Sequence, residues 1–223
     1  MNWLIEFFTD PANWSGTYGI PHRLLEHLQF SVTAVLIAVL IAVPLGLLIG
    51  HTGRGALAVV ISANAASALP TLGLLVLIVL LVGPGSVLPV LIPLALLAVP
   101  PILVNTFEGI RGVDRDLRDA AYGMGLRGPQ VLLRVLVPSA LPVILLGIRL
   151  AAIQVVATAT VAAFVGLGGL GRFIVDGLAT KNFPSTIGGA ALVALAAVTT
   201  QGLFVLIEKV AVSPGVSRRL KVR

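Results

Sequence analysis

Residues 30–50 read FSVTAVLIAVLIAVPLGLLIG and contain no charged side chain. A transmembrane helix needs about 20 predominantly apolar residues to cross about 30 Å of hydrocarbon. A transmembrane β-strand is shorter and alternates apolar with polar residues, which this run does not do. The stretch Phe30–Gly50 therefore predicts a membrane-spanning α-helix.

Four more stretches of the chain have a similar length and character. Glycine and proline recur within them, which membrane helices tolerate because neighbouring groups satisfy the freed backbone atoms. One of these prolines, Pro70, is expected to kink its helix. The sequence therefore predicts an all-α membrane protein with five transmembrane helices, which cover Phe30–Gly50, Leu57–Val82, Val87–Phe107, Pro138–Val165 and Ser185–Ile207.

The composition agrees with a membrane protein. Of the 223 residues, 57% are hydrophobic and 11% are charged, and the mean hydropathy is +1.06. Soluble domains have about 45–50% apolar and about 25% charged residues, so a cytoplasmic enzyme is excluded because its surface could not be covered. The large apolar fraction also excludes intrinsic disorder. The chain has no cysteine, which removes disulfides and thiolate metal ligands.

The lysines and arginines are distributed unevenly between the two ends of the predicted spans. One end has only Arg23, Arg172 and Lys181, and Arg149 lies within the fourth span. Cytoplasmic loops carry the excess of basic residues, so the opposite end is expected in the cytoplasm and the N-terminus outside. This placement explains the net charge of +6 without a nucleic acid partner, because the cytoplasmic end holds Arg54, Arg111, Arg115, Arg118, Arg127, Arg134, Lys209, Arg218, Arg219, Lys221 and Arg223.

The spans divide the chain into three expected parts. These are an external N-terminal segment, a transmembrane domain with one long cytoplasmic loop, and a basic cytoplasmic tail, covering residues 1–29, 30–208 (loop 108–137) and 209–223. In the first part, Pro21–Ser31 has leucines on one side and polar residues on the other, which predicts a short helix at the membrane interface. Trp3 and Trp14 are expected to anchor this segment at the same level.

The sequence lacks the residues that ion-coupled transport, ATP binding and metal binding usually require. All nine acidic residues lie outside the predicted spans, whereas ion-coupled carriers place carboxylates within the membrane. No lysine follows a glycine as in the Gly-Lys-Ser/Thr phosphate loop, so this chain is not expected to bind ATP. No second histidine or cysteine stands at metal-ligand spacing from His22, His27 or His51. Neither a metal site nor a catalytic residue is expected.

One glycine-rich segment matches a cofactor pattern. Residues 166–171 read GLGGLG, which fits G-x-G-x-x-G. That pattern indicates a dinucleotide only where it lies between a strand and a helix, and here it follows a membrane span. We therefore expect a tight turn of close-packed backbone and no cofactor.

The segment 108–137 is the only sizeable polar stretch between the spans. Asp119, Ala120 and Ala121 are expected to begin a short helix, since an acid suits the positive end of the helix dipole. The small side chains of the two alanines would let a partner surface approach closely. Gly125 is expected to end that helix with a sharp turn.

A second short helix is expected after this turn. Apolar residues at Val131, Leu132, Val135 and Leu136 give the next segment one apolar side, and Pro138 opens the following span. Two short, exposed helices at one corner would suit binding by another protein.

The spacing in this loop resembles the coupling-loop signature of bacterial ABC importer permeases. That signature reads Glu-Ala-Ala, three residues, Gly, nine residues, then Ile-x-Leu-Pro. This chain keeps the spacing with three conservative departures, Asp for Glu, Val for Ile and Val for Leu, at the positions Asp119, Ala120, Ala121, Gly125, Val135, Val137 and Pro138.

The resemblance extends over roughly residues 24–208. Arg111-Gly-Val-Asp114 and Ala162-Ala-Phe-Val-Gly166 look like the permeases for osmoprotectants such as glycine betaine, choline, carnitine and proline betaine. The methionine importer permease is similar in size and shares the coupling loop and the glycine-rich stretch. A permease for methionine or another amino acid therefore remains the alternative.

The resemblance implies the transmembrane domain of a type I ABC importer in a bacterial cell membrane. In that family two permease subunits, copies or paralogues, pair around a central pathway. Two cytoplasmic ATPases hold their coupling loops, and an external binding protein delivers the substrate. The chain itself would not be an enzyme, and Asp119, Ala120, Ala121 and Gly125 would seat in a groove of the ATPase.

Uncharged polar residues within the spans are candidates for the translocation pathway. Such groups also hydrogen-bond across helices, so both roles stay open. Arg149 could reach the cytoplasmic edge, pair within a permease dimer or take part in gating. The candidates for the pathway, with the proline between them, are Ser62, Asn64, Ser67, Pro70, Thr71, Gln154, Thr158 and Thr160.

Two other classes of protein are weighed against a permease. A membrane scaffold that transports nothing would share the topology but would not need the Asp-Ala-Ala…Gly corner. A channel would need rings of charge or filter carbonyls, which the sequence does not show.

Overall fold

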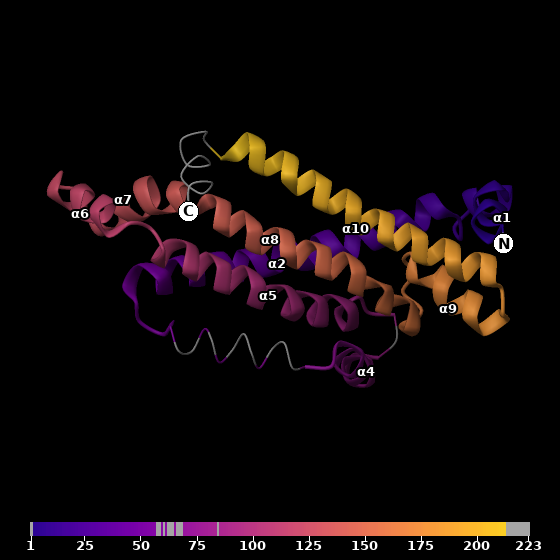
Figure 1. Ribbon diagram of the computed structural model, residues 1–223. Helices are drawn as coiled ribbons and strands as arrows, with labels where there is room; N and C mark the ends of the chain where they lie inside the picture. Colours follow the sequence, from indigo (N-terminus) through magenta and orange to yellow (C-terminus); the bar gives the residue numbers. More distant parts are fainter. Residues whose placement is uncertain are drawn as a thin grey trace. The chain divides into compact units, whose positions relative to one another are not determined.

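The computed structural model describes residues 2–56, 59, 61, 65, 69–83 and 85–212. All regular structure in these residues is helical (Figure 1). In chain order the elements are α1 (Trp3–Thr9), η1 (Pro11–Trp14), α2 (Ile20–Thr52), α4 (Thr71–Val82), α5 (Leu88–Arg111), α6 (Arg115–Gly123), α7 (Gly128–Val131), the π-helical η2 (Leu132–Leu136), α8 (Val137–Thr158), η3 (Ala159–Val165), α9 (Gly171–Thr180) and α10 (Phe183–Ala211).

Four helices in the described part are long and apolar enough to cross a membrane, and not the five that the sequence predicts. They are α2, α5, the continuous helical stretch Gly128–Val165 and α10. The predicted span Leu57–Val82 falls partly outside the described residues. Its described helix, α4, has 12 residues and begins only after Pro70, whose backbone is extended (φ −71°, ψ 107°). Pro70 therefore precedes a helix and does not kink one.

The short helix expected at Pro21–Ser31 is the first part of α2. Neither glycine nor proline separates this segment from the following apolar run, so nothing interrupts the helix. Its buried side also differs from the expected one. His27 is fully buried and its Nε2 lies 2.8 Å from the carbonyl oxygen of Val156, whereas Leu25 is 55% exposed.

The contacts within the chain define two compact units, and each long helix contributes to both. One unit comprises Met1–Leu36, Leu69–Leu97 and Ala152–Thr200, and the other comprises Ile37–Ala68, Ala98–Ala151 and Gln201–Arg223. We call them the N-terminal unit and the loop unit, and each is described separately.

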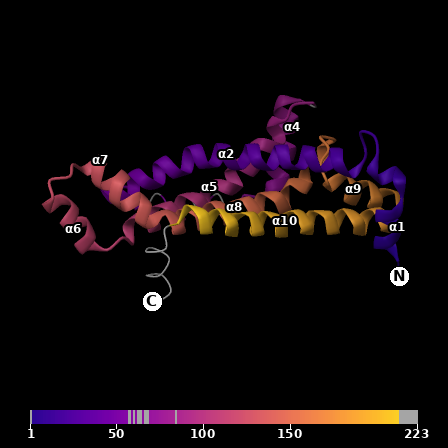
Figure 2. The same cartoon turned by 90° about the horizontal axis from the view of Figure 1, so that it is seen from above.

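An aromatic cluster forms the core of the N-terminal unit where α1 lies beside the start of α10 (Figure 2). Phe7 meets Phe173 edge to face, with ring centroids 5.3 Å apart, and Trp3 stacks on Phe183 at 5.8 Å. Gly188 of α10 lies directly against the Phe7 ring, where any Cβ would collide with it. The aromatic rings therefore hold α1 onto α10.

The glycine-rich segment 166–171 forms a tight turn in the same unit, as the sequence predicts. Gly166, Gly168 and Gly169 all have positive φ, which glycine adopts without steric cost. The Gly169 N–H donates to Glu26 Oε2 at 2.8 Å, and that carboxylate also pairs with Arg23 at 2.8 Å. The turn is thereby fastened to α2.

Close approach of helices characterises the loop unit. A Cβ on Gly46 would lie 2.7 Å from the Thr106 Cβ, and one on Gly147 would lie 2.6 Å from the Asn105 Cβ. Small residues at such contacts let helix backbones pack tightly in a membrane, where no hydrophobic driving force holds them together. These glycines therefore bring α2 and α8 against α5.

Candidate functional site

The exposed corner of the loop unit consists of α6, α7 and the turn between them. Its first helix, α6, starts earlier than the sequence predicts. Asp114 is its N-cap, and the Asp114 Oδ1 accepts a hydrogen bond from the Asp116 N–H at 3.0 Å. Such a bond satisfies one of the free N–H groups at a helix start. Asp119 consequently lies within α6 and not at its beginning.

The end of α6 agrees with the expectation for Gly125. This residue adopts a left-handed conformation, with φ of +80°. The N–H of Leu126 bonds the Ala121 carbonyl at 3.3 Å, and that of Gly125 bonds the Tyr122 carbonyl at 2.9 Å. This pair of bonds is the Schellman arrangement, which satisfies carbonyls at a helix end and reverses the chain.

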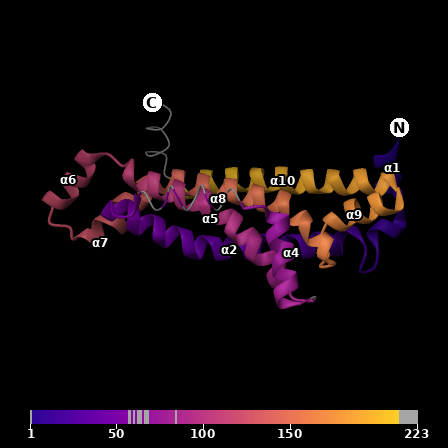
Figure 3. The ribbon, with the colours of Figure 1, turned by 90° about the horizontal axis from the view of Figure 1, so that it is seen from below.

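The second short helix of the prediction is joined to the next span. After the turn, α7 continues without interruption through η2 into α8, and Figure 3 shows α6 and α7 meeting at the corner. Pro138 is the second residue of α8 and lies two positions after the last residue of the π-helical turn, Leu136. A proline lacks the N–H that closes a helical hydrogen bond, and the wider π turn lets the helix continue past it.

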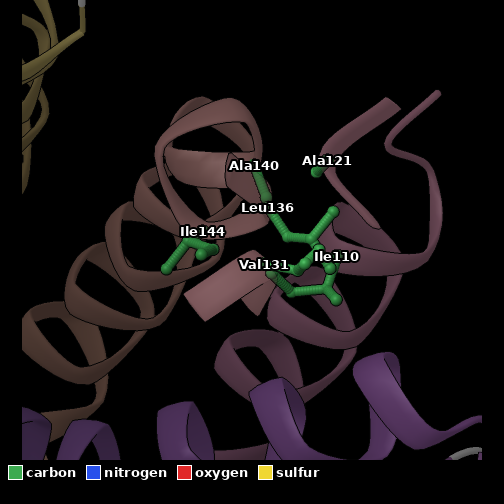
Figure 4. Close-up of a cluster of buried hydrophobic side chains, with 6 residues drawn as sticks. All are labelled: Ile110, Ala121, Val131, Leu136, Ala140 and Ile144. Carbon is green, nitrogen blue, oxygen red and sulfur yellow. The ribbon is translucent and has the colours of Figure 1, made fainter. Parts of the chain in front are cut away.

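A buried apolar cluster fixes the corner to the helices beneath it (Figure 4). Ala121 comes from α6, Ile110 from α5, and the others from the α7–α8 helix. Ala121 is 1% exposed, whereas Ala120 and Asp119 are exposed. The two alanines therefore differ: Ala121 packs inward, and only Ala120 presents a small side chain to a partner. The cluster comprises Ile110, Ala121, Val131, Leu136, Ala140 and Ile144.

Gly125→Ala is expected to destabilise the corner. A Cβ at positive φ costs about 1–2 kcal/mol, and here it would loosen the turn that ends α6. The matched control is Gly123→Ala, since Gly123 lies in α6 without positive φ and no described atom would meet its Cβ within 4 Å. Limited proteolysis should cleave near the corner faster in the first variant and no faster in the second. Equal cleavage of both would contradict a structural role for Gly125.

The pathway candidates are only partly placed by the structure. Ser62, Asn64 and Ser67 lie outside the described residues. Thr71 is the first residue of α4, and α4 contacts η3, which contains Thr160. The structure thus brings two elements that carry candidates into contact within the N-terminal unit.

The candidates on the α8–η3 stretch have different surroundings. Gln154 is exposed, while Thr158 and Thr160 are half-buried. The Thr160 hydroxyl donates to the carbonyl of Ala157 at 3.1 Å, so it is satisfied within its own helix.

The sequence does not predict two contacts of charged side chains in the loop unit. Arg149 pairs with Glu208 at 3.4 Å, which joins α8 to α10 across 59 positions of the chain. Arg118 Nη2 donates to the Ile110 carbonyl at 3.2 Å, which ties α6 to the end of α5. The capping role of Asp114 did have a signal, because an acid just before a polar helical segment is a common N-cap.

Comparison with known proteins shows the family of this chain. Residues 26–218 match the family described as "Binding-protein-dependent transport system inner membrane component". The carnitine transport permease protein OpuCB of Listeria monocytogenes is 38% identical over 184 residues, covering 81% of this chain and 84% of that protein. The choline transport system permease protein OpuBB of Bacillus subtilis is 36% identical over 200 residues, covering 90% and 91%.

Solved structures agree on the fold. An inward-facing structure of the MetNI methionine ABC transporter superposes with a TM-score of 0.74 and 21% identity, over 87% of this chain and 96% of that chain. The fold is thus that of a type I ABC importer transmembrane domain. With a family match over most of its length and relatives well above 30% identity, the chain belongs to the multi-pass inner membrane components of binding-protein-dependent transport systems.

Proposed function

We propose that this chain is the permease subunit of an ATP-driven importer for osmoprotectants such as glycine betaine, choline or carnitine. The observation that carries the substrate class is the 36–38% identity to carnitine and choline permeases over more than 80% of both chains. The likeness to the methionine transporter is 21% and concerns the fold alone. Osmoprotectants are therefore favoured over methionine.

The exposed part of α6 is the proposed contact with a cytoplasmic ATPase. Asp119 and Ala120 face outward, while Ala121 and the apolar cluster hold the helix from behind. A helix with one small and one acidic exposed residue can enter a groove of a partner. Because the apolar cluster holds this helix rigidly, a movement of the partner would be passed on to the membrane-spanning helices. ATP hydrolysis would take place on that partner.

The proposed assembly follows from this contact. A second permease, identical or paralogous, completes the pathway, and an external binding protein supplies the substrate. The loop end of the spans faces the cytoplasm, as the basic residues of the sequence indicate. The candidates for the pathway that lie in the described residues are Pro70, Thr71, Gln154, Thr158 and Thr160.

Growth under osmotic stress tests the proposed substrate class. A host without its own osmoprotectant importers receives this chain with its partner subunits and is grown in high salt. Rescue by glycine betaine or carnitine is expected, because each restores turgor only after uptake. Rescue should be lost when the ATPase partner is inactivated. Methionine uptake without any such rescue would contradict the osmoprotectant class and retain the permease.

A further inference from the structure

A basic cavity lies beside the corner, at the end of two membrane-length helices. It has a volume of about 420 Å³ and is formed where the end of α2 meets the α5–α6 connection. Arg111, Arg115 and Arg118 line it together with His51 and Thr52. All of these residues belong to the loop unit.

The arginines around this cavity lack acidic partners. Within the described residues, none of the three forms an ion pair, and no carboxylate lines the cavity. Glu108, Asp114, Asp116 and Asp119 lie close to these arginines in sequence, but none of the four lines the cavity, and the Asp114 carboxylate caps α6. The ends of α2 and α5 contribute partial negative charges of about −0.5 each, which three guanidinium groups outweigh. The side chains that line the cavity therefore carry a net positive charge.

Two of the residues that line the cavity each have a buried nitrogen without a hydrogen-bond partner in the part of the chain that the structure describes. Arg118 Nε and His51 Nδ1 are buried and have no hydrogen-bond partner among the described residues. A buried polar atom without a partner costs about 1–3 kcal/mol, so such atoms normally meet a protein group, water or ligand. An anion with several acceptor oxygens would pair with the exposed guanidinium groups of Arg111 and Arg115, whereas the two buried nitrogens are closed off from the cavity.

We propose that this cavity binds a phosphate group, supplied by the headgroup of an anionic phospholipid or by free phosphate. Guanidinium groups match phosphate oxygens in charge and in hydrogen-bond geometry. The cavity lies at the polar ends of apolar spans, which is the level of lipid headgroups, and basic pockets at such positions recognise anionic lipids. The inference rests on the cavity alone and does not depend on the imported substrate.

Lipid titration followed by native mass spectrometry tests the proposal on the full chain purified with its partner subunits. The probes are phosphatidylglycerol, phosphatidylcholine and inorganic phosphate. Each arginine near an anionic headgroup contributes about fivefold in affinity, so Arg111→Gln with Arg115→Gln should weaken phosphatidylglycerol binding about 25-fold. Arg134→Gln is the matched control, because Arg134 is an exposed arginine of the same loop outside the cavity.

The arms of the experiment separate the sources of phosphate. Phosphatidylglycerol binding that weakens only in the cavity variant identifies a lipid site. Stabilisation by inorganic phosphate that is lost in the same variant identifies free phosphate. Arg115→Gln alone, expected to lose about fivefold, keeps the test decisive if the double variant does not fold. Equal binding by all variants would overturn the proposal. It would also be overturned if neither probe bound and the cavity variant instead lost the ATPase, since a protein acid would then be the occupant.

Discussion

Replacing Asp119 with arginine is expected to abolish substrate-stimulated ATP hydrolysis by the assembled transporter. Asp119 is exposed on α6, and no described hydrogen bond or ion pair holds its side chain. The substitution reverses the charge and adds a long side chain at the proposed contact. Like-charge juxtaposition at an interface costs several kcal/mol, so we expect a loss of about 100-fold or more. The assay is phosphate release from the purified complex with its binding protein and substrate.

A matched charge reversal separates this effect from a general change in the loop. Glu108→Arg alters another exposed carboxylate, in the last turn of α5 and outside α6. It should keep most of the stimulated hydrolysis, and both variants should unfold at the wild-type temperature. Full activity in Asp119→Arg would refute the contact between α6 and the ATPase.

Gly171→Ala is expected to destabilise the protein by about 2 kcal/mol or more, because extra atoms in close-packed regions force the backbone to move. A Cβ on Gly171 would collide with the Thr160 carbonyl oxygen and lie 2.8 Å from the Thr160 Cα. Both are backbone atoms and cannot rotate away as a side chain does. The predicted fall in Tm is about 5 °C for a chain of this size, measured by thermal unfolding in detergent.

A second helical glycine provides the control for this substitution. Gly202 lies within α10, and no described atom would meet its Cβ within 4 Å. Alanine is favoured over glycine in a helix interior, so Gly202→Ala should leave Tm unchanged or raise it slightly. An equal loss of stability in both variants would show that the tight contact of Gly171 with Thr160 is not the cause.

The long spans could be predicted because each depends on local composition. Uninterrupted apolar runs give α2, α5, α8 and α10 their length, and only their ends differ from the predicted boundaries. The segment before Pro70 is also mostly apolar and carries no charged residue, so hydropathy joined it to α4. The backbone at Pro70 is extended, and the 12-residue helix α4 begins directly after it. Hydropathy does not predict this break.

At the corner, too, local features could be predicted from the sequence and contacts between helices could not. The turn at Gly125 could be predicted, because glycine alone adopts positive φ without cost. The different roles of Ala120 and Ala121 could not, because the burial of Ala121 depends on residues from α5 and α8 that are distant in sequence. For the same reason the Arg149–Glu208 pair and the basic cavity emerge only from the folded chain.

Uptake by proteoliposomes is the most direct test of the central claim. The chain is reconstituted with its ATPase and binding protein, and ATP is enclosed on the side of the coupling corner. We predict that labelled glycine betaine, choline or carnitine accumulates only with hydrolysable ATP, and that Asp119→Arg abolishes this accumulation. Accumulation without ATP, or no transport of any of these compounds by an assembled complex, would contradict the account.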